Sequence, residues 1–315
     1  MHSGIVIGLL AAILQSLSYL VSASFVRGNA GRSGAATALV ARSYLVMGAF
    51  SALALPAICH AHPGQVPPFA LWGGAATGAI VSNMIAQAAM FFTLKAADAS
   101  RVSPLLGIKI LFLALLGIVF AGDRYGTWQW TGIGLALVSA LLLSRSGGRL
   151  GAAGAVGVAV TALAYAGSDF CIRLQQAAFH EYGERLAASG GEPLPVVAAN
   201  LTILWGDYVL GGLAGLVALP FTGRYPARAW PRHVLPYAAV WLGAMTLLYL
   251  SFELLGVVHG TIVQSTRGLI SIALGWALAR LGGTALERRL SPHAFAGRVF
   301  AGALMFLAIL VFCRR

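Results

Sequence analysis

Two cations stand inside long apolar stretches of this sequence. Lys109 is the one formal charge in SPLLGIKILFLALLG (103–117), and Arg267 is the one formal charge in HGTIVQSTRGLISIALGW (259–276). At bilayer depth a lysine or arginine costs about 3 kcal/mol on insertion scales, so it needs a partner or a function. Lysine offers a point charge and arginine a bidentate fork, which together suit a phosphate or a carboxylate. We therefore predict that these cations bind an anionic substrate.

A structural role competes with this prediction. Asp207 lies midway through an apolar segment and could pair with Lys109 or Arg267, in which case the ion pair would tie helices together. Arg267 has more polar company than Lys109, because several small or polar residues share its face at helical spacing. These residues are Gly260, Gln264 and Ser271. Arg267, with Gln264 beside it, is therefore the stronger site candidate of the two cations.

Four further residues complete the predicted binding site: Asn83, Gln87, Tyr19 and Tyr165. Asn83 and Gln87 are four positions apart, so a helix presents both amides on one side, where they either bind substrate or join helices by hydrogen bonds. Tyr19 and Tyr165 hold matching places in two apolar segments. They either line a cavity or serve as aromatic packing.

Two carboxylates are candidates for ion coupling or for pairing with a cation. Glu253 could couple transport to protons if burial raises its pKa, or it could pair with His259 across a short turn. Coupling by Asp207 is comparably plausible. Asp169 and Arg173 are four residues apart, so we expect them to pair with each other on one helix.

The composition is that of an integral membrane protein. Of 315 residues, 59% are hydrophobic and 10% are charged, and the mean hydropathy is +0.83. A soluble domain carries about 25% charged residues. The net charge of +12 does not indicate nucleic-acid binding, because the basic residues lie between apolar runs rather than in one patch.

Enzyme chemistry finds little support in the sequence. The histidines and cysteines have no HExxH or CxxC spacing, and no GxSxG nucleophile motif or nucleotide-binding signature occurs. We therefore expect no enzyme activity, no metal and no cofactor, and we expect a small-molecule substrate and the lipid bilayer as partners.

About 20 apolar residues are needed for a helix to span a bilayer, and ten segments of roughly that length fit the sequence. They are 3–26, 35–58, 69–93, 99–121, 127–144, 151–172, 196–220, 235–256, 257–281 and 293–313. The connections between them are rich in Gly, Pro and charged residues. The longest connection could hold a short surface helix. The expected fold class is an all-α integral membrane protein.

An internal repeat divides the chain into two halves, 1–148 and 149–315. Residues 91–120 align with residues 249–278, which places Lys109 on Arg267, and a second alignment places Tyr19 on Tyr165. Five crossings followed by five more must run in opposite senses, so the halves form an inverted repeat. Transporters use this design, with the substrate site near the midplane between the halves.

The stretch 91–143 resembles the second half of an EamA-type domain in the drug/metabolite transporter (DMT) superfamily. The resemblance rests on a turn followed by a proline, an acidic residue after the helix, and a glycine-led next helix. The matching residues are Asp98, Pro104, Asp123 and Gly132, with Glu287 and Gly297 in the second half and Arg42 in the second helix. The resemblance implies a secondary transporter that works by alternating access.

These observations predict a transporter of a small metabolite, most simply an organic anion, in the cell inner membrane. The alternative is a carrier or flippase for an anionic lipid headgroup. Twelve of the 21 Lys and Arg residues lie near one set of segment ends and five near the other. By the positive-inside rule both termini then lie outside the cytoplasm, whereas the family that the sequence resembles usually has both termini in the cytoplasm. A monomer and a homodimer are both compatible with the sequence.

Overall fold

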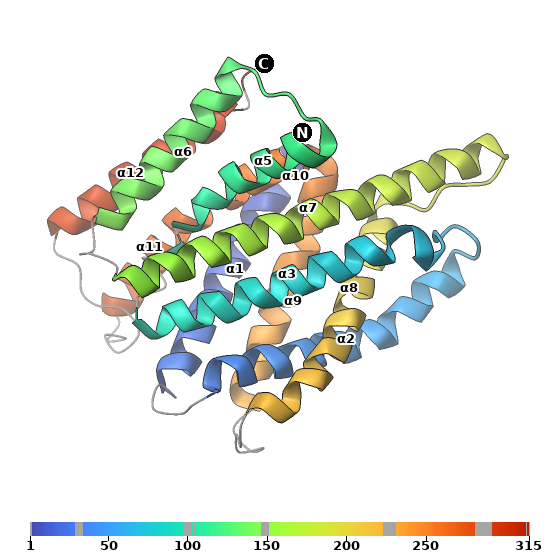
Figure 1. Ribbon diagram of the computed structural model, residues 1–315, viewed down its shortest axis with the longest axis horizontal. Coiled ribbons are helices and arrows are strands. Elements are labelled where there is room, and N and C mark those ends of the chain that lie inside the picture. Colours follow the sequence, from blue (N-terminus) through green and yellow to red (C-terminus); the bar gives the residue numbers. More distant parts are fainter. Residues whose placement is uncertain are drawn as a thin grey trace.

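The computed structural model describes residues 2–28, 34–96, 102–103, 105–145, 151–222, 231–280, 292–312 and 314. Apart from short connections, these residues form helices (Figure 1), and no strand occurs among them. The helices are α1 (His2–Gly28), α2 (Ala35–Ala61), α3 (Phe69–Ala96), α5 (Lys109–Ala121), α6 (Thr127–Arg145), α7 (Ala152–Ala188), α8 (Val196–Ala218), α9 (Pro231–Leu255), α10 (Val257–Gln264), α11 (Arg267–Arg280) and α12 (Pro292–Phe312). Short 3₁₀ turns, η1 (Leu106–Ile108) and η2 (Leu219–Thr222), precede α5 and follow α8. The motif residues Asp98, Pro104 and Glu287 lie outside the described ranges.

Six of the described helices are long and apolar enough to cross a membrane: α1, α2, α3, α7, α8 with η2, and α9. Three shorter apolar helices cover Leu106–Ala121, Thr127–Leu142 and Ala296–Phe312. The expectation of an all-helical chain with several membrane spans is confirmed. Ten crossings arranged as an inverted repeat remain a prediction.

Both segments that carry the central cations are broken rather than continuous. The 3₁₀ turn η1 leads into α5, whose first residue is Lys109. The segment 257–281 is interrupted at Ser265 and Thr266, whose hydroxyls bond to the carbonyl oxygens of Thr261 and Val263, and Arg267 then begins α11. Side-chain hydroxyls that bond back to the preceding turn commonly bend helices, which explains this break.

α7 is longer than a single bilayer crossing requires. The sequence predicted a segment that ends at residue 172 and a separate short surface helix, but α7 continues to Ala188. Residues 173–188 are mostly strong helix formers. The ion pairs His180–Glu184 and Glu181–Arg185 add support one turn apart. The helix ends only where Gly190 adopts φ 85°.

The helices pack in pairs that join the two halves of the chain. α1 packs on α9, α3 on α7, α2 on α8 and α6 on α12, and Figure 1 shows α3 and α7 lying side by side over much of their length. Glycine allows the closest approach. A Cβ at Gly48 of α2 would lie 2.5 Å from the Cα of Gly212 in α8. Small residues at such crossings are typical of helix packing in membranes.

Candidate functional site

Lys109 is a buried cation with a buried acid as its partner. Its side chain is 2% exposed, and Nζ lies 2.7 Å from Oδ2 of Asp169 in α7. Nζ also donates to Oε1 of Gln264, and Thr261 donates to the same Asp169 oxygen over 3.2 Å. The ammonium is therefore neutralised within the protein. The sequence predicted a pair between Asp169 and Arg173 and allowed Asp207 as a partner of Lys109. In the structure, Lys109 and Asp169 pair with each other.

Arg267 is buried without an acid. It is 2% exposed, and no described carboxylate lies within ion-pair distance of it. Its Nη1 donates to Oε1 of Gln15 over 3.2 Å and to the hydroxyl of Tyr19 over 3.3 Å. Its Nε is buried and donates to no described residue. A buried guanidinium with a free donor and no described countercharge has the chemistry to donate hydrogen bonds to the oxygens of an anion.

Two glutamines connect the cations. Gln264 accepts from Lys109 and donates from Nε2 to Oε1 of Gln15 over 2.6 Å, and the same Gln15 oxygen accepts from Arg267. The predicted residues Lys109, Gln264 and Arg267 therefore lie in one hydrogen-bonded cluster. We name this cluster, with Gln15 and Asp169, the cationic centre. It holds two positive charges and one negative charge.

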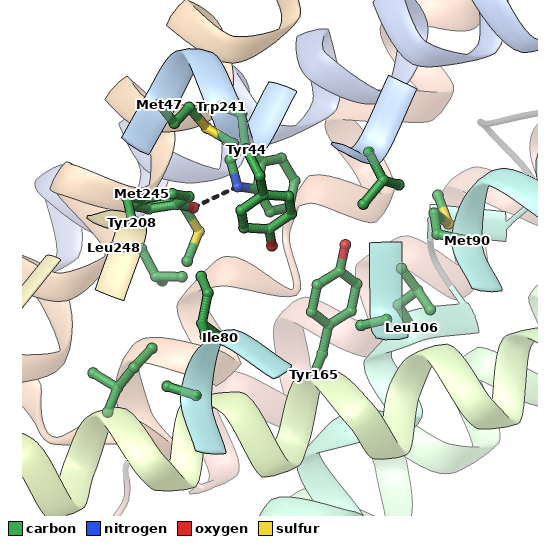
Figure 2. Close-up of a cluster of buried hydrophobic side chains, with 14 of the residues drawn as sticks. Tyr44, Met47, Ile80, Met90, Leu106, Tyr165, Tyr208, Trp241, Met245 and Leu248 are labelled. Carbon is green, nitrogen blue, oxygen red and sulfur yellow. Dashed lines mark hydrogen bonds between the residues drawn. The ribbon is translucent and has the colours of Figure 1, made fainter. Parts of the chain in front are cut away.

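Aromatic rings cover the cationic centre on one side. The guanidinium carbon of Arg267 lies 5.7 Å from the ring centroid of Tyr19, which itself is 6.2 Å from that of Trp241 in α9. Tyr165 and Tyr237 stack on Trp241 at 6.3 and 5.9 Å. Figure 2 shows Tyr165 pointing its hydroxyl toward this group, and Trp241 donating to the Tyr208 hydroxyl over 2.7 Å. The predicted tyrosines thus meet at one buried aromatic wall.

Asn83 and Gln87 belong to a neighbouring network. Gln87 Nε2 donates to Oδ1 of Asn83 over 2.9 Å, and Tyr44 donates to the same oxygen over 3.0 Å. The Tyr237 hydroxyl donates to Oε1 of Gln87 over 3.0 Å. Because Tyr237 also stacks on Trp241, the amides support the aromatic wall rather than touching the cations directly.

Asp207 lies apart from the cationic centre. The expectation that it pairs with Lys109 or Arg267 is wrong, because Lys109 has Asp169 and no described cation lies within ion-pair distance of Asp207. It is fully buried and accepts from Tyr249 over 2.6 Å and from Gln175 over 3.3 Å, both at Oδ2. Its Oδ1 is buried and has no described hydrogen-bond partner.

An open pocket of about 540 Å³, here named the vestibule, lies between α7, the α5–α6 connection and the α9–α10 junction. Its polar lining includes Asp123, Arg173, Gln176, His180, Glu253 and His259. A second pocket of about 280 Å³ shares Gln176, His180 and Glu253 and reaches Ala199 and Ile203 of α8. Glu253 is exposed here, so the burial that would make it a coupling residue is lacking.

Asp123 and Arg173 close one wall of the vestibule. Arg173 bonds both carboxylate oxygens of Asp123, with Nη2 to Oδ1 at 2.8 Å, and Tyr125 donates to Oδ2 over 3.1 Å. The Arg173 hydrogen bonds hold the pKa of Asp123 below its usual range. Burial, followed by the Asp123 charge, raises the pKa of Tyr125. Arg173 thus pairs across to the α5–α6 connection, not with Asp169 on its own helix.

Sequence reasoning missed several residues of the site: Gln15, Trp241, Tyr44, Tyr208, Tyr237, Tyr249 and Gln175. One signal was available for Gln15. It precedes Tyr19 by four residues, so both fall on one helix face, and a glutamine in an apolar segment is costly unless bonded. The aromatic residues carry no comparable signal, because isolated tyrosines in apolar segments are more often packing.

Fold and site together define a multi-pass, all-helical membrane protein with a buried cationic centre. Residues 2–145 match the EamA-like transporter family, so the family resemblance is confirmed over that part of the chain. A curated relative from a Sinorhizobium species, described as an uncharacterized transporter in the cobO 3′ region, is 35% identical over 82 residues. The match covers 26% of this chain and 54% of that relative, so the chain spans about half the relative's length.

A solved structure, described only as the crystal structure of a protein, matches over nearly the whole chain. The TM-score is 0.58, and the match covers 99% of this chain and 96% of the other at 16% sequence identity. At that identity the likeness shows the fold alone.

Proposed function

We propose that this protein is a secondary transporter that moves a small organic anion across the membrane, with Arg267 as the principal substrate ligand. The observation that carries the proposal is the buried guanidinium without an acid and with a free Nε. The match of residues 2–145 to a transporter family supports the transport step.

The charge balance of the cationic centre favours a singly charged anion. Lys109 and Asp169 cancel, and Arg267 leaves one net positive charge. A monocarboxylate would accept from the guanidinium, and an apolar body could pack on Tyr19 and Trp241, whose rings lie beside it. Lys109 then acts mainly through Gln264, which it holds in place. This proposal agrees with the sequence-based ranking of Arg267 above Lys109 as a substrate ligand.

The helix pairing supports alternating access. By their order in the two halves, α1, α2, α3 and α6 correspond to α7, α8, α9 and α12. When each helix is replaced by its counterpart, the α1–α9 pair becomes the α7–α3 pair, and the α2–α8 and α6–α12 pairs are unchanged. An inverted repeat generates this pattern, and rocking of one half against the other moves a fixed central site between the two membrane faces. The helix breaks before Lys109 and Arg267 are consistent with this proposal, because transporters of this design bind substrate at discontinuous helices.

The vestibule supplies one access route. It opens at the end of the molecule where α9 meets α10 and where α5 turns into α6. The cationic centre is buried, so the described conformation is closed toward it. A lipid headgroup would use the same cations, and no feature of the described residues favours it over a free anion.

The test is ligand-dependent thermal stabilisation of the purified protein. We expect monocarboxylates to raise the melting temperature of the wild type, monophosphates to do so more weakly because they carry more than one negative charge near pH 7, and amines and neutral solutes to have no effect. Loss of charge-assisted hydrogen bonds is worth about 1.5–3 kcal/mol, so R267Q should bind monocarboxylates roughly 10- to 100-fold more weakly.

The matched control is R185Q, which removes an exposed arginine of α7 that pairs only with Glu181 among the described residues. It should retain the wild-type response. Undiminished anion binding by a folded R267Q, or stabilisation by amines instead, would overturn the proposed site.

A further inference from the structure

We propose that Asp207 is a proton-binding site that couples the transport proposed above to proton movement. The inference rests on the proposed function for its role and on the surroundings of Asp207 for its chemistry. The carboxyl is protonated in the closed conformation described here and releases its proton to water when the vestibule opens toward it. The proton leaves Asp207 for a vestibule water or buffer base, and the carboxylate that remains becomes hydrated.

The first argument is the absence of a countercharge. Asp207 is fully buried, and within the described ranges no Lys, Arg or His lies within ion-pair distance. An isolated carboxylate in an apolar interior is so costly that the group takes up a proton instead. Asp169 is also buried but is paired with Lys109, so the two buried aspartates differ in having a countercharge.

The second argument is the hydrogen-bond pattern. Tyr249 and Gln175 both donate to Oδ2, while the buried Oδ1 has no described partner. A carboxylate would leave charge on an oxygen that nothing stabilises. In a carboxylic acid with its hydroxyl at Oδ1, the carbonyl oxygen Oδ2 accepts both donors, and the oxygen without a described partner carries a neutral hydroxyl, which costs less to bury than a charge. The geometry therefore fits the acid form.

The third argument concerns the neighbouring titratable groups. α8 packs on α2, α3, α7, α9 and η2. The titratable groups that interact with Asp207 are Tyr44 of α2, Cys171 of α7, Tyr208 of α8 and Tyr249 of α9. Phenols and thiols are neutral near pH 7. α3 carries no titratable residue between Phe69 and Leu94, and η2 carries none. Among the described residues, none forms an ion pair with Asp207.

The fourth argument is the proximity of water. Ile203 lines the second pocket, which adjoins the vestibule, and precedes Asp207 by one turn of α8. Glu253 lines both pockets and follows Tyr249, the donor to Asp207, by one turn of α9. Residues four apart on a helix are neighbours. About one helical turn thus separates Asp207 from the second pocket, which shares Gln176, His180 and Glu253 with the vestibule, and a modest helix movement would hydrate the carboxyl group.

The test has one readout that needs no substrate. Infrared spectroscopy of the purified protein detects the carbonyl stretch of a protonated carboxylic acid. We expect wild type to show this band at neutral pH, D207N to lose it, and E192Q to keep it. Glu192 is an exposed carboxyl in the α7–α8 connection and is the control. No such band, or a band unchanged in D207N, would overturn the proposal.

Exchange of a bound anion in liposomes gives the second readout. Wild type and E192Q should show pH-dependent exchange, whereas D207N, which mimics the protonated acid, should exchange at a rate that varies less than twofold from pH 6 to 9. Full wild-type pH dependence in D207N would refute the coupling role. If the band titrates but the protein exchanges no anion, the proton-binding site is supported and the proposed transport function is contradicted.

If D207N fails to fold, Y249F keeps the proposal testable, because it deletes one hydrogen bond to Oδ2 and preserves the ring. We expect the band to change frequency and to titrate at a different pH. An unchanged frequency and midpoint in Y249F would overturn the assignment to Asp207.

Discussion

Lys109 and Arg267 hold the same position in their helices: each is the first residue of an α-helix that follows a break, at α5 and α11. Gln264 and Gln15 join the two side chains in one chain of hydrogen bonds. They differ in charge balance, because Lys109 bonds Asp169 over 2.7 Å and Arg267 has no described acid. The two residues therefore hold equivalent positions but differ in charge balance, and the proposed function assigns substrate binding to Arg267.

The Lys109–Asp169 pair should behave as a buried ion pair in a double-mutant cycle. K109Q leaves Asp169 unpaired and should lower the free energy of unfolding by about 3–5 kcal/mol, and D169N should cost a similar amount. The double variant K109Q/D169N should recover most of the loss, since neither buried group is then charged. Unfolding by an anionic detergent in mixed micelles measures this. If the double variant loses the sum of the two single-variant free energies of unfolding, Lys109 and Asp169 have no coupling energy.

The crossing of α2 and α8 should tolerate no side chain at Gly48. A Cβ there meets the Cα of Gly212 at 2.5 Å and the carbonyl oxygen of Tyr208 at 2.7 Å, both of which are backbone atoms. G48A should therefore cost about 1–3 kcal/mol of stability. Gly74 of α3 has nothing within 4 Å and is the control, where alanine should be neutral or stabilising by up to about 1 kcal/mol. Equal melting temperatures of G48A and G74A would contradict this packing.

The Asp123–Arg173 pair should not contribute pH dependence in the neutral range. The lowered pKa of Asp123 means that its stabilisation is present above the unfolded value of about 3.9 and is lost as the pH falls through the lower folded value. The difference in melting temperature between wild type and D123N should therefore be constant from about pH 5 to 8. A difference that changes steadily across that window would show that another group titrates with the pair.

Gln15 should matter to the site although it carries no charge. Its Oε1 accepts from both Gln264 and Arg267, so Q15L leaves two buried donors without their acceptor. We expect a loss of about 1–3 kcal/mol in stability and a weaker anion response. Q15E adds the missing acid beside Arg267 and should abolish anion binding while keeping the fold. Retained anion-dependent stabilisation in Q15E would argue that the substrate lies elsewhere.

Apolar length and breaker residues were enough to place the helices along the chain, because both are local properties. The end of α7 could not be placed this way. The length needed to span a bilayer does not indicate whether a helix continues past the membrane surface, as α7 does to Ala188. The break before Arg267 also escaped, because Ser265 and Thr266 are compatible with a continuous helix until their hydroxyls bond the preceding carbonyls.

The candidate site was predictable in its residue types and not in its pairing. A charged residue in an apolar segment is conspicuous, so Lys109, Arg267 and Asp207 were found. Which acid meets which cation depends on how α5, α7, α8 and α11 are placed in space. Asp169 and Arg173 illustrate this, because four-residue spacing allowed a local pair, yet each found a partner on another element.

Anion exchange across liposomes is the most direct test of the central site. Wild type, R267Q and R185Q would be reconstituted, loaded with an unlabelled monocarboxylate or monophosphate identified by thermal stabilisation, and supplied with the labelled compound outside. The structure predicts saturable uptake by wild type and R185Q, and at least tenfold less by R267Q at equal protein content. Equal uptake by R267Q, with correct folding shown by its melting temperature, would contradict a central anion site at Arg267.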